Sequence, residues 1–344
     1  MVVFNGESWR REDLVRWVGS MDQLAGIRLV EAGEGKARGS RILEVWNGTG
    51  LTFDVLADRA LDISTCRYRG TPLSWTSMVG DVHPSYYESS GFGWLRSFQG
   101  GLVATCGLDQ FGSPGVDEGE EFGIHGRISN LPARFVGHRA RWEGDEYLLE
   151  VTGEVRQSRV FGENLVLRRT IGTALGRDRI SICDVVTNEG FFPQPHMILY
   201  HFNLGFPLVN TDTRLLVDAS ESSPRDADAA GGFDRWSEFQ APTPGYREQV
   251  FHHLPRADRN GRACVEVSNH ALGLGLRWTI DARTLPHLFE WKQMGEGMYV
   301  LGIEPANCAA IQGRAAARES GDLPHLEPGE SVHYTIELDV VGYD

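Results

Sequence analysis

Residues 165–171 read Leu-Val-Leu-Arg-Arg-Thr-Ile, and residues 333–340 read His-Tyr-Thr-Ile-Glu-Leu-Asp-Val. In both stretches apolar and β-branched side chains line one side of an extended chain. A two-residue period of this kind is typical of a β-strand that buries one face and exposes the other. Both stretches therefore predict strands, and the same texture recurs along most of the chain.

Further segments of this kind are separated by turn signals such as Gly144-Asp145, Asn260-Gly261 and Pro328-Gly329. The predicted strands are Ile27–Ala32, Arg41–Trp46, Leu51–Leu56, Asp62–Tyr68, Tyr147–Glu154, Leu165–Gly172, Arg179–Asn188, Ala263–Ser268, Leu272–Ile280, Met298–Glu304 and Ser331–Val341. No helical pattern lies between them, which favours antiparallel sheets arranged as a sandwich or barrel. The predicted fold class is therefore all-β.

A helical pattern precedes the strands. Within residues 8–25, apolar residues from Leu14 to Met21 recur at intervals of three and four, while charged residues take the other face. We expect a short N-terminal helix within a helical extension over residues 1–26. Because the strand texture then continues to the end without a repeat or linker, we interpret residues 1–344 as a single domain.

The composition limits the functions that the chain can have. Of 344 residues, 41 are Gly and 15 are Pro, and the formal net charge is −14. An acidic surface without a basic stripe disfavours binding to nucleic acids and to anionic membranes. The five cysteines form no CxxC pair, so we expect buried reduced thiols and no structural zinc site. Without a signal-peptide pattern or an apolar run of roughly 20 residues, the protein is expected to be cytoplasmic and soluble.

Two long segments lack strand character. Residues 77–124 are rich in Gly, Ser, Pro and aromatic residues, and residues 219–249 are polar with scattered Pro. Loops of this length in a compact domain usually carry function or cover a site. The second segment is expected either to cap a cleft or to lie in a homodimer interface, and the sequence does not decide between the two.

Titratable residues stand beside Gly, Pro or aromatic residues in segments that lie far apart in the chain. His125, His201, Glu304 and Arg127 are the members of this group. Imidazole moves protons near neutral pH, a carboxylate at a strand end serves as its complementary base, and a guanidinium binds hydroxyls. Together they suit an acid/base site that acts on a polyol. Simpler explanations are a turn residue for His125, a hydrogen-bonded core residue for His201 and a plain strand-end carboxylate for Glu304. No residue spacing indicates a metal or cofactor site.

Five motifs together resemble the aldose 1-epimerase (galactose mutarotase) superfamily, and more closely a poorly characterised bacterial branch of it. They are Arg59-Ala60-Leu61-Asp62-Ile63, Gly100-Gly101-Leu102-Val103-Ala104-Thr105-Cys106-Gly107-Leu108, Ile124-His125-Gly126-Arg127, Tyr200-His201-Phe202-Asn203-Leu204-Gly205 and Glu304-Pro305-Ala306-Asn307. The resemblance implies a large antiparallel β-supersandwich with an open cleft for one sugar, which agrees with the strands predicted from the residues.

The resemblance also implies an activity, namely interconversion of the anomers of a free, non-phosphorylated sugar or sugar acid without cofactor or metal. His201 would be the general acid on the ring oxygen and Glu304 the general base on the anomeric hydroxyl. His125 would hold the sugar and share in stabilising the transition state, and Arg127 and Asn203 would bind substrate. For this role His201 must be protonated, and nearby carboxylates are expected to keep it so.

The chain departs from the superfamily at several positions. Gln99 stands where branches that act on phosphorylated hexoses have Arg, which argues against a phosphosugar, although Arg96 lies near enough to compensate. The usual sugar-binding Asp has no clear counterpart, and Glu290, Trp291 or Lys292 is expected to replace it. Trp291 could stack on a pyranose face.

Arg59 and Asp62 belong to the motif of this branch. They are expected either to line the cleft and bind substrate or to form a structural ion pair. Two other functions also stay open. One is a non-catalytic sugar-binding protein on the same fold. The other is elimination or isomerisation of an oxidised sugar, since a His/Glu pair can also remove a proton α to a carbonyl.

Overall fold

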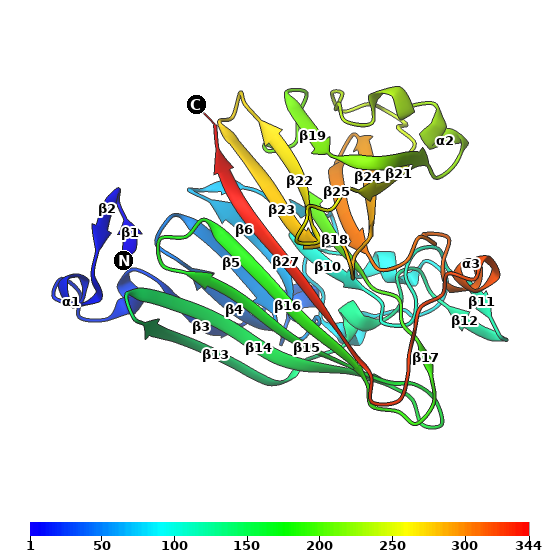
Figure 1. The fold of residues 1–344 in the computed structure, drawn as a ribbon, viewed down its shortest axis with the longest axis horizontal. Coiled ribbons are helices and arrows are strands. Elements are labelled where there is room, and N and C mark those ends of the chain that lie inside the picture. The colour runs from blue at the N-terminus through cyan, green and yellow to red at the C-terminus, as the bar shows by residue number, and fades with distance from the viewer. Residues whose placement is uncertain (344) are drawn as a thin grey trace.

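The computed structural model describes residues 1–343 and consists mainly of two large antiparallel sheets (Figure 1). One sheet has eight strands in the order β13-β14-β15-β16-β27-β23-β22-β19. The other has eleven, in the order β20-β21-β24-β25-β18-β10-β6-β5-β4-β3 with β7 paired to β6. The predicted all-β sandwich is confirmed.

The elements have the following bounds. The eight-stranded sheet contains β13 (Arg134–Glu143), β14 (Glu146–Ser158), β15 (Asn164–Ala174), β16 (Arg179–Asn188), β19 (Thr213–Val217), β22 (Arg262–Asn269), β23 (Leu274–Asp281) and β27 (Ser331–Gly342). The eleven-stranded sheet contains β3 (Gly26–Glu31), β4 (Arg41–Trp46), β5 (Leu51–Leu56), β6 (Asp62–Tyr68), β7 (Thr71–Pro72), β10 (Val103–Cys106), β18 (Leu199–Leu204), β20 (Ala219–Pro224), β21 (Gln249–Pro255), β24 (His287–Gly295) and β25 (Met298–Ala306).

Short strands and helices complete the fold. The short strand pairs are β1 (Val2–Phe4) with β2 (Glu7–Trp9), β8 (Trp75–Thr76) with β9 (Gly100–Gly101), β11 (Gly115–Asp117) with β12 (Glu120–Phe122), and β17 (Gln194–Pro195) with β26 (His325–Leu326). The α-helices are α1 (Arg11–Leu14), α2 (Ala227–Ala230) and α3 (Arg314–Ser320). The 3-10 helices are η1 (Met21–Gln23), η2 (Gly35–Ala37), η3 (Pro84–Tyr86), η4 (Gly93–Arg96), η5 (Ile128–Asn130) and η6 (Phe233–Arg235). No helix in residues 1–343 is long and apolar enough to cross a membrane.

The main hydrophobic core lies between the two sheets. Every second residue of β27 from Tyr334 to Leu338 is buried in it, as the sequence alternation predicts. Phe202 of β18 packs edge-on against Trp278 of β23, with ring centroids 5.7 Å apart. This contact crosses from one sheet to the other. Burial of these apolar faces is the main force that holds the sheets together.

A buried ionic network also joins the two sheets. The guanidinium of Arg169 on β15 lies 2.6 Å from Asp184 on β16 and 3.0 Å from Asp62 on β6. The hydroxyl of Tyr200 on β18 donates to Asp184 across 2.7 Å, and that of Thr105 on β10 donates to Asp62 across 2.6 Å. Every oxygen of the two carboxylates thus has a partner, which offsets the cost of burying these charges.

The predicted helix within residues 8–25 is wrong in its length. Only the four residues of α1 are α-helical there, and Leu14 is its buried residue. Trp17 is 75% exposed. The Ser20 hydroxyl accepts a hydrogen bond from the backbone N–H of Asp22 and begins the separate turn η1. Because a Ser side chain that bonds the backbone favours a new turn over helix continuation, the expected helical extension over residues 1–26 is reduced to α1 and η1.

Several strands were missed by the sequence analysis, and β18 is the most important. All six of its residues are buried, because both faces of this central strand are covered. A strand of that kind shows no alternation of apolar and polar residues. The segments 77–124 and 219–249 likewise contain β10 and β20, which their Gly and Ser content concealed.

Candidate active site

His201 and Glu304 lie side by side on neighbouring strands. β18 pairs with β25 so that Phe202 faces Ile303, and both of these residues point into the main core. Since successive side chains alternate, His201 and Glu304 point to the opposite face of the sheet. There the Nε2 atom of His201 lies 3.2 Å from Oε1 of Glu304, and both side chains are almost fully buried.

His125 joins this pair from a separate turn. Its backbone N–H donates to the carbonyl of Gly112, and its φ of 60° lies in the left-handed region. The next residue, Gly126, also has positive φ, and a Cβ there would lie 2.4 Å from the carbonyl oxygens of Gln110 and Gly107. The turn therefore requires glycine. It holds the His125 ring 5.5 Å from that of His201, at an interplanar angle of 79°.

The three residues border a cavity of about 670 Å³ between the eleven-stranded sheet and the loops over it. Much of its wall is aromatic. The ring centroids of Trp291 and Phe98 each lie 5.3 Å from that of His201. Other members of the wall are Trp75, Phe92, Trp94, Ile124, Val250 and Met298. Aromatic surfaces of this kind suit the C–H face of a sugar ring, and His201 and Glu304 add polar groups to the wall.

Burial shifts both members of the central pair toward their neutral forms. It lowers the pKa of His201 well below its usual value, and the neighbouring His125 adds to the shift. It raises the pKa of Glu304 well above its usual value, with a further contribution from Glu248. The expectation that nearby carboxylates keep His201 protonated is therefore wrong, because the desolvation of the imidazolium outweighs their attraction. The arrangement favours a state in which His201 and Glu304 share one proton over a state with a charged imidazolium beside a charged carboxylate.

The 219–249 segment contributes to the cavity at both of its ends. Arg225, Asp226 and Glu248 all line it. Arg225 donates to Asp226 across 2.7 Å and to Glu248 across 3.2 Å. Glu248 also accepts a hydrogen bond of 2.8 Å from Nε1 of Trp291. The segment therefore borders the cavity through these three residues, whereas both its role as a cap over the cleft and its place in a homodimer interface stay predictions.

Several residues expected to bind substrate lie outside the cavity lining. Arg127 lies 4.0 Å from Glu120, and exposed Arg96 lies 3.4 Å from Glu88. Lys292 points to the other face of β24, where its ammonium donates to the carbonyl of Arg235 across 2.9 Å. Adjacent residues of a strand face opposite ways. Trp291 lines the cavity, so its neighbours Glu290 and Lys292 cannot.

Arg59 and Asp62 are structural, but they do not pair with each other. Asp62 is held by Arg169 and Thr105. Arg59 is buried and donates to the carbonyls of Ser129 and Val82. It thereby ties the corner before β6 to the loop before Trp94 and to the turn after His125. Arg59 thus supports the cavity without lining it.

Gln99 and Asn203 are buried at the edge of the site. Asn203 donates to the carbonyl of His201 across 2.8 Å and to that of Gly100 across 3.3 Å. The two bonds together brace the backbone of His201 against the strand pair β8-β9. The amide of Gln99 has no hydrogen-bond partner within residues 1–343. Neither side chain belongs to the cavity lining.

The sequence analysis names Trp291 of the aromatic wall, but it names neither the other aromatic residues of that wall nor Glu248 and Asp226. The aromatic content of residues 77–124 pointed to the wall, but the carboxylates carry no local signal, since they follow from the fold of a polar loop. Within residues 1–343, no group of three or more His, Cys, Asp and Glu side chains is placed to hold a metal ion.

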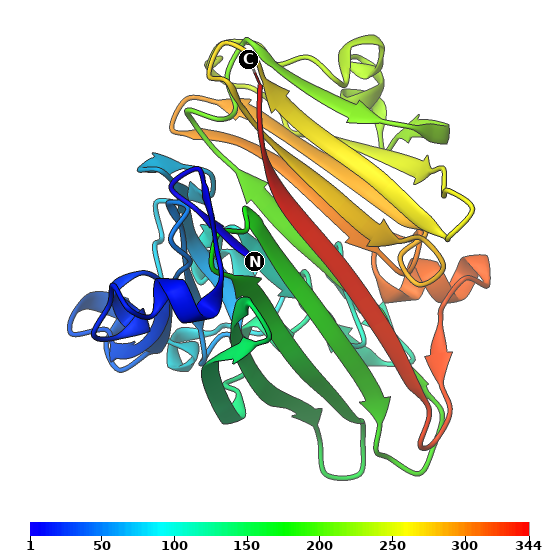
Figure 2. The same cartoon turned by 60° about the vertical axis from the view of Figure 1, so that its left-hand side comes forward.

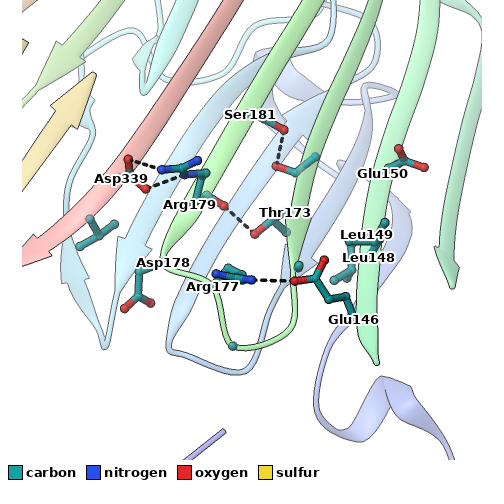
Figure 3. A pocket seen from close by; sticks show the side chains of 14 residues that line it. Glu146, Leu148, Leu149, Glu150, Thr173, Arg177, Asp178, Arg179, Ser181 and Asp339 are labelled. Atoms are coloured by element: carbon teal, nitrogen blue, oxygen red, sulfur yellow. Dashed lines mark hydrogen bonds and ion pairs between the residues drawn. The ribbon is translucent and has the colours of Figure 1, made fainter. Parts of the chain in front are cut away.

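A second pocket of about 670 Å³ lies on the eight-stranded sheet, around the β15-β16 turn (Figure 3). Its arginines are already paired. Arg179 lies 2.6 Å from Asp339, and Arg177 lies 2.6 Å from Glu146. The hydroxyl of Thr173 donates to the carbonyl of Arg179 across 2.7 Å. Asp178 keeps one carboxylate oxygen without a partner within residues 1–343. No His lies in this lining to form an acid/base pair with a carboxylate, so this pocket is the weaker candidate for chemistry.

Comparison with protein families gives a match over residues 37–340 to the family described as "Domain of unknown function (DUF4432)". The chain belongs to this family. Comparison with curated protein sequences gives no match. Among solved structures, a Klebsiella pneumoniae protein with a provisional aldose 1-epimerase name is 28% identical and has a TM-score of 0.88. The match covers 94% of the DUF4432 chain and 86% of that protein.

Two more distant structures share the fold of the DUF4432 chain. A galactose mutarotase-like protein from Clostridium acetobutylicum is 13% identical with a TM-score of 0.64, over 93% of this chain and 99% of that one. Galactose 1-epimerase from Lactobacillus acidophilus is 13% identical with a TM-score of 0.59, over 93% of this chain and 100% of that one. The resemblance to galactose mutarotase-like proteins found in the sequence is confirmed.

Proposed function

We propose that this DUF4432 protein interconverts the anomers of a free, uncharged aldose, with His201 and Glu304 exchanging protons with the sugar. The observation that carries the proposal is the 3.2 Å separation of these two buried groups at the wall of a largely aromatic cavity. The aldose 1-epimerase and mutarotase names of the structural relatives support it.

The chemistry needs one proton acceptor and one proton donor at the same carbon. The acceptor takes the proton of the anomeric hydroxyl, and the released O–H electron pair forms the C1=O1 double bond. The C1–O5 bond breaks with its electrons moving to O5, which the donor protonates. Rotation about C1–C2 and closure on the other face then give the other anomer. Two groups held this close can reach O1 and O5 of a single sugar.

A single proton on the pair is enough for this reaction. If it resides on Glu304, neutral His201 accepts from O1 and Glu304 donates to O5. If it moves to His201, the roles reverse. Because anomerisation must run in both directions, each catalytic group has to serve as donor in one direction and acceptor in the other. The opposite pKa shifts of the two groups support this shared-proton scheme.

The charges at the cavity favour an uncharged sugar. Among its lining residues the permanent cation is Arg225, which already contacts the carboxylates of Asp226 and Glu248. A sugar acid or phosphosugar would have to displace one of them and meet the repulsion of the other. Neutral hydroxyls can instead donate to these carboxylates without losing an ion pair.

Anomer exchange measured by NMR or polarimetry on freshly dissolved α-sugar tests the proposal. A panel of neutral aldoses should include at least one whose equilibration the protein accelerates. His201→Gln and Glu304→Gln should each lower kcat by roughly 100-fold or more, the usual contribution of a general acid or base. Glu290→Gln is the matched control, since Glu290 is equally buried but faces away from the cavity.

Loss of activity confined to the first two variants supports the proposal. Saturable sugar binding with no acceleration in the wild-type protein would contradict it and favour a binding protein. Acceleration that persists in Glu304→Gln would show that the pair is not the catalyst.

A further inference from the structure

Four large apolar side chains protrude from one end of the eight-stranded sheet. Val160 and Phe161, in the turn between β14 and β15, are 81% and 104% exposed. Phe191 and Phe192, in the loop after β16, are 89% and 73% exposed. We call these four residues the aromatic tip. None of them lines the proposed sugar cavity.

The turn and the loop that carry the aromatic tip are neighbours. The side-chain amide of Asn164 donates to the carbonyl of Glu189 across 3.0 Å, and the backbone N–H of Glu189 donates to the carbonyl of Asn164 across 2.9 Å. Arg156 of β14 also lies 2.6 Å from the Glu189 carboxylate. Figure 2 shows the β14-β15 turn and the loop after β16 at the same lower end of the sheet. The four side chains therefore protrude from neighbouring loops at the same end of the sheet.

The fold itself gives no reason for these side chains. Phe161 adopts a φ of 62°, in the left-handed region that a residue with a Cβ occupies only at some cost. A turn at a strand end is normally built from Gly, Asn or Asp. Monomeric proteins seldom expose contiguous apolar patches of more than a few hundred Å², so such a patch indicates a binding surface.

The charges on the turn and loop that carry the tip are paired within the chain. Glu189 lies 2.6 Å from each of Arg156 and Arg168. Arg159 lies 2.9 Å from Glu120 and 3.3 Å from Glu163. Two copies of this chain, whose net charge is −14, can therefore bring these two loops together without leaving the carboxylates of Glu189 and Glu163 unpaired. The exposed Glu330 lies in the neighbouring turn, where its carbonyl accepts from the backbone N–H of Asn188. The two loops also offer no unpaired arginine among these residues to an anionic membrane or to an acidic partner.

We propose that the aromatic tip is the interface of a symmetric homodimer in which the tips of two copies pack against each other. Each buried aromatic side chain covers roughly 150–250 Å². Three phenylalanines and a valine therefore approach the roughly 800 Å² that each partner buries in a standard interface. A twofold axis through the tip lets the same surface serve both copies. The proposal is independent of the activity proposed above.

Sedimentation velocity over a concentration series tests it, using the wild-type chain of 344 residues and the double variant Phe161→Ser/Phe191→Ser. The wild type should sediment as a dimer, and the double variant should dissociate with a Kd at least about 100-fold weaker. The matched control is Leu216→Ser. It removes a 57% exposed apolar side chain from β19, an edge strand of the same sheet that does not carry the tip, and it should leave the dimer intact.

Circular dichroism and the thermal unfolding midpoint show whether the double variant is folded, and both should match the wild type because the replaced side chains contact solvent. A wild type that stays monomeric at tens of micromolar would overturn the proposal. So would a folded double variant that remains fully dimeric, or a monomeric wild type that instead binds phosphatidylserine vesicles through the tip.

Discussion

Nε1 of Trp291 donates a hydrogen bond to Oε2 of Glu248 across 2.8 Å. The bond joins β24, which carries part of the aromatic wall, to the end of the 219–249 segment. The other carboxylate oxygen of Glu248 accepts from Arg225 across 3.2 Å. Glu248 therefore sets two properties of the cavity at once, namely the position of an aromatic side chain and how far the positive charge of Arg225 is neutralised.

Replacement of Glu248 by Gln should change which sugars bind. Gln keeps an oxygen that can accept from Trp291 but removes the negative charge, which leaves Arg225 paired with Asp226 alone. Binding of a hexuronate relative to the parent hexose should improve by about tenfold, equivalent to ~1.4 kcal/mol of electrostatic free energy. Titration of tryptophan fluorescence with each sugar measures this ratio.

Glu266→Gln is the control for a general effect of net charge, because Glu266 pairs with Arg277 on the other sheet. An equal gain in hexuronate binding in this control would show that Glu248 has no specific role in selectivity.

The sequence predicts the half-exposed strands of the sheets better than it predicts the buried strands that carry His201 and Glu304. β16 and β27 begin at their predicted residues because one face of each is clearly more polar than the other. β18 was missed because every one of its residues is buried. His201 and Glu304 were named through motifs that lie about 100 residues apart, and no local pattern states that their strands pair.

The partners of Asp62 show a different limit. Asp62 was expected either to bind substrate or to pair with nearby Arg59, whereas its cationic partner is Arg169 from the other sheet. Such a contact depends on how two sheets stack, which a strand pattern does not encode. The direction of the Lys292 side chain could be predicted from the sequence, because a strand that points Trp291 into the cavity points both neighbouring residues away from it.

The buried Arg169 network should dominate the stability of the sandwich. Arg169→Met leaves Asp62 and Asp184 without their buried counter-charge, and it should lower the free energy of unfolding by ~3–5 kcal/mol. Arg179→Met is the matched control, because Arg179 pairs with Asp339 across neighbouring strands at the surface and should cost no more than about 1 kcal/mol. Urea unfolding measures both, and equal effects would contradict a special role for the network.

His196 should make stability depend on pH. Its ring nitrogens contact the carbonyl of Leu108 at 2.9 Å and the hydroxyl of Tyr334 at 2.8 Å, and burial lowers the pKa of His196 to about 4. The unfolded chain binds this proton near pH 6.5 and the folded chain does not. The contribution of neutral His196 is therefore fully present above pH 6.5 and is lost progressively as the pH falls to about 4.

The variant His196→Gln isolates this effect from other titrating groups. At pH 7.5 it should be less stable than the wild type by ~1–3 kcal/mol, because it loses buried hydrogen bonds. By pH 4.5 the difference in stability should shrink by ~2–3 kcal/mol. The reason is that only the wild type has an imidazole at position 196 whose pKa differs between the folded and unfolded chains. Urea unfolding at the two pH values gives both differences, and a gap that stays constant would show that His196 does not titrate as its burial implies.

The turn that carries His125 should be sensitive to a single methyl group at Gly126. Gly126→Ala puts a Cβ 2.4 Å from two carbonyl oxygens, so the backbone must move, and the adjacent His125 ring moves with it. Because a displacement of about 1 Å in an active site can cost 100-fold in rate, we expect a loss of that order in anomer exchange.

Gly119→Ala is the control, since Gly119 also has positive φ, 82°, but a Cβ there meets nothing within 4 Å. Both variants carry the same kind of backbone strain, roughly 1 kcal/mol, and differ only in the clash. A similar loss of rate in both would assign the effect to strain in general, whereas a loss confined to Gly126→Ala places it in the geometry of His125.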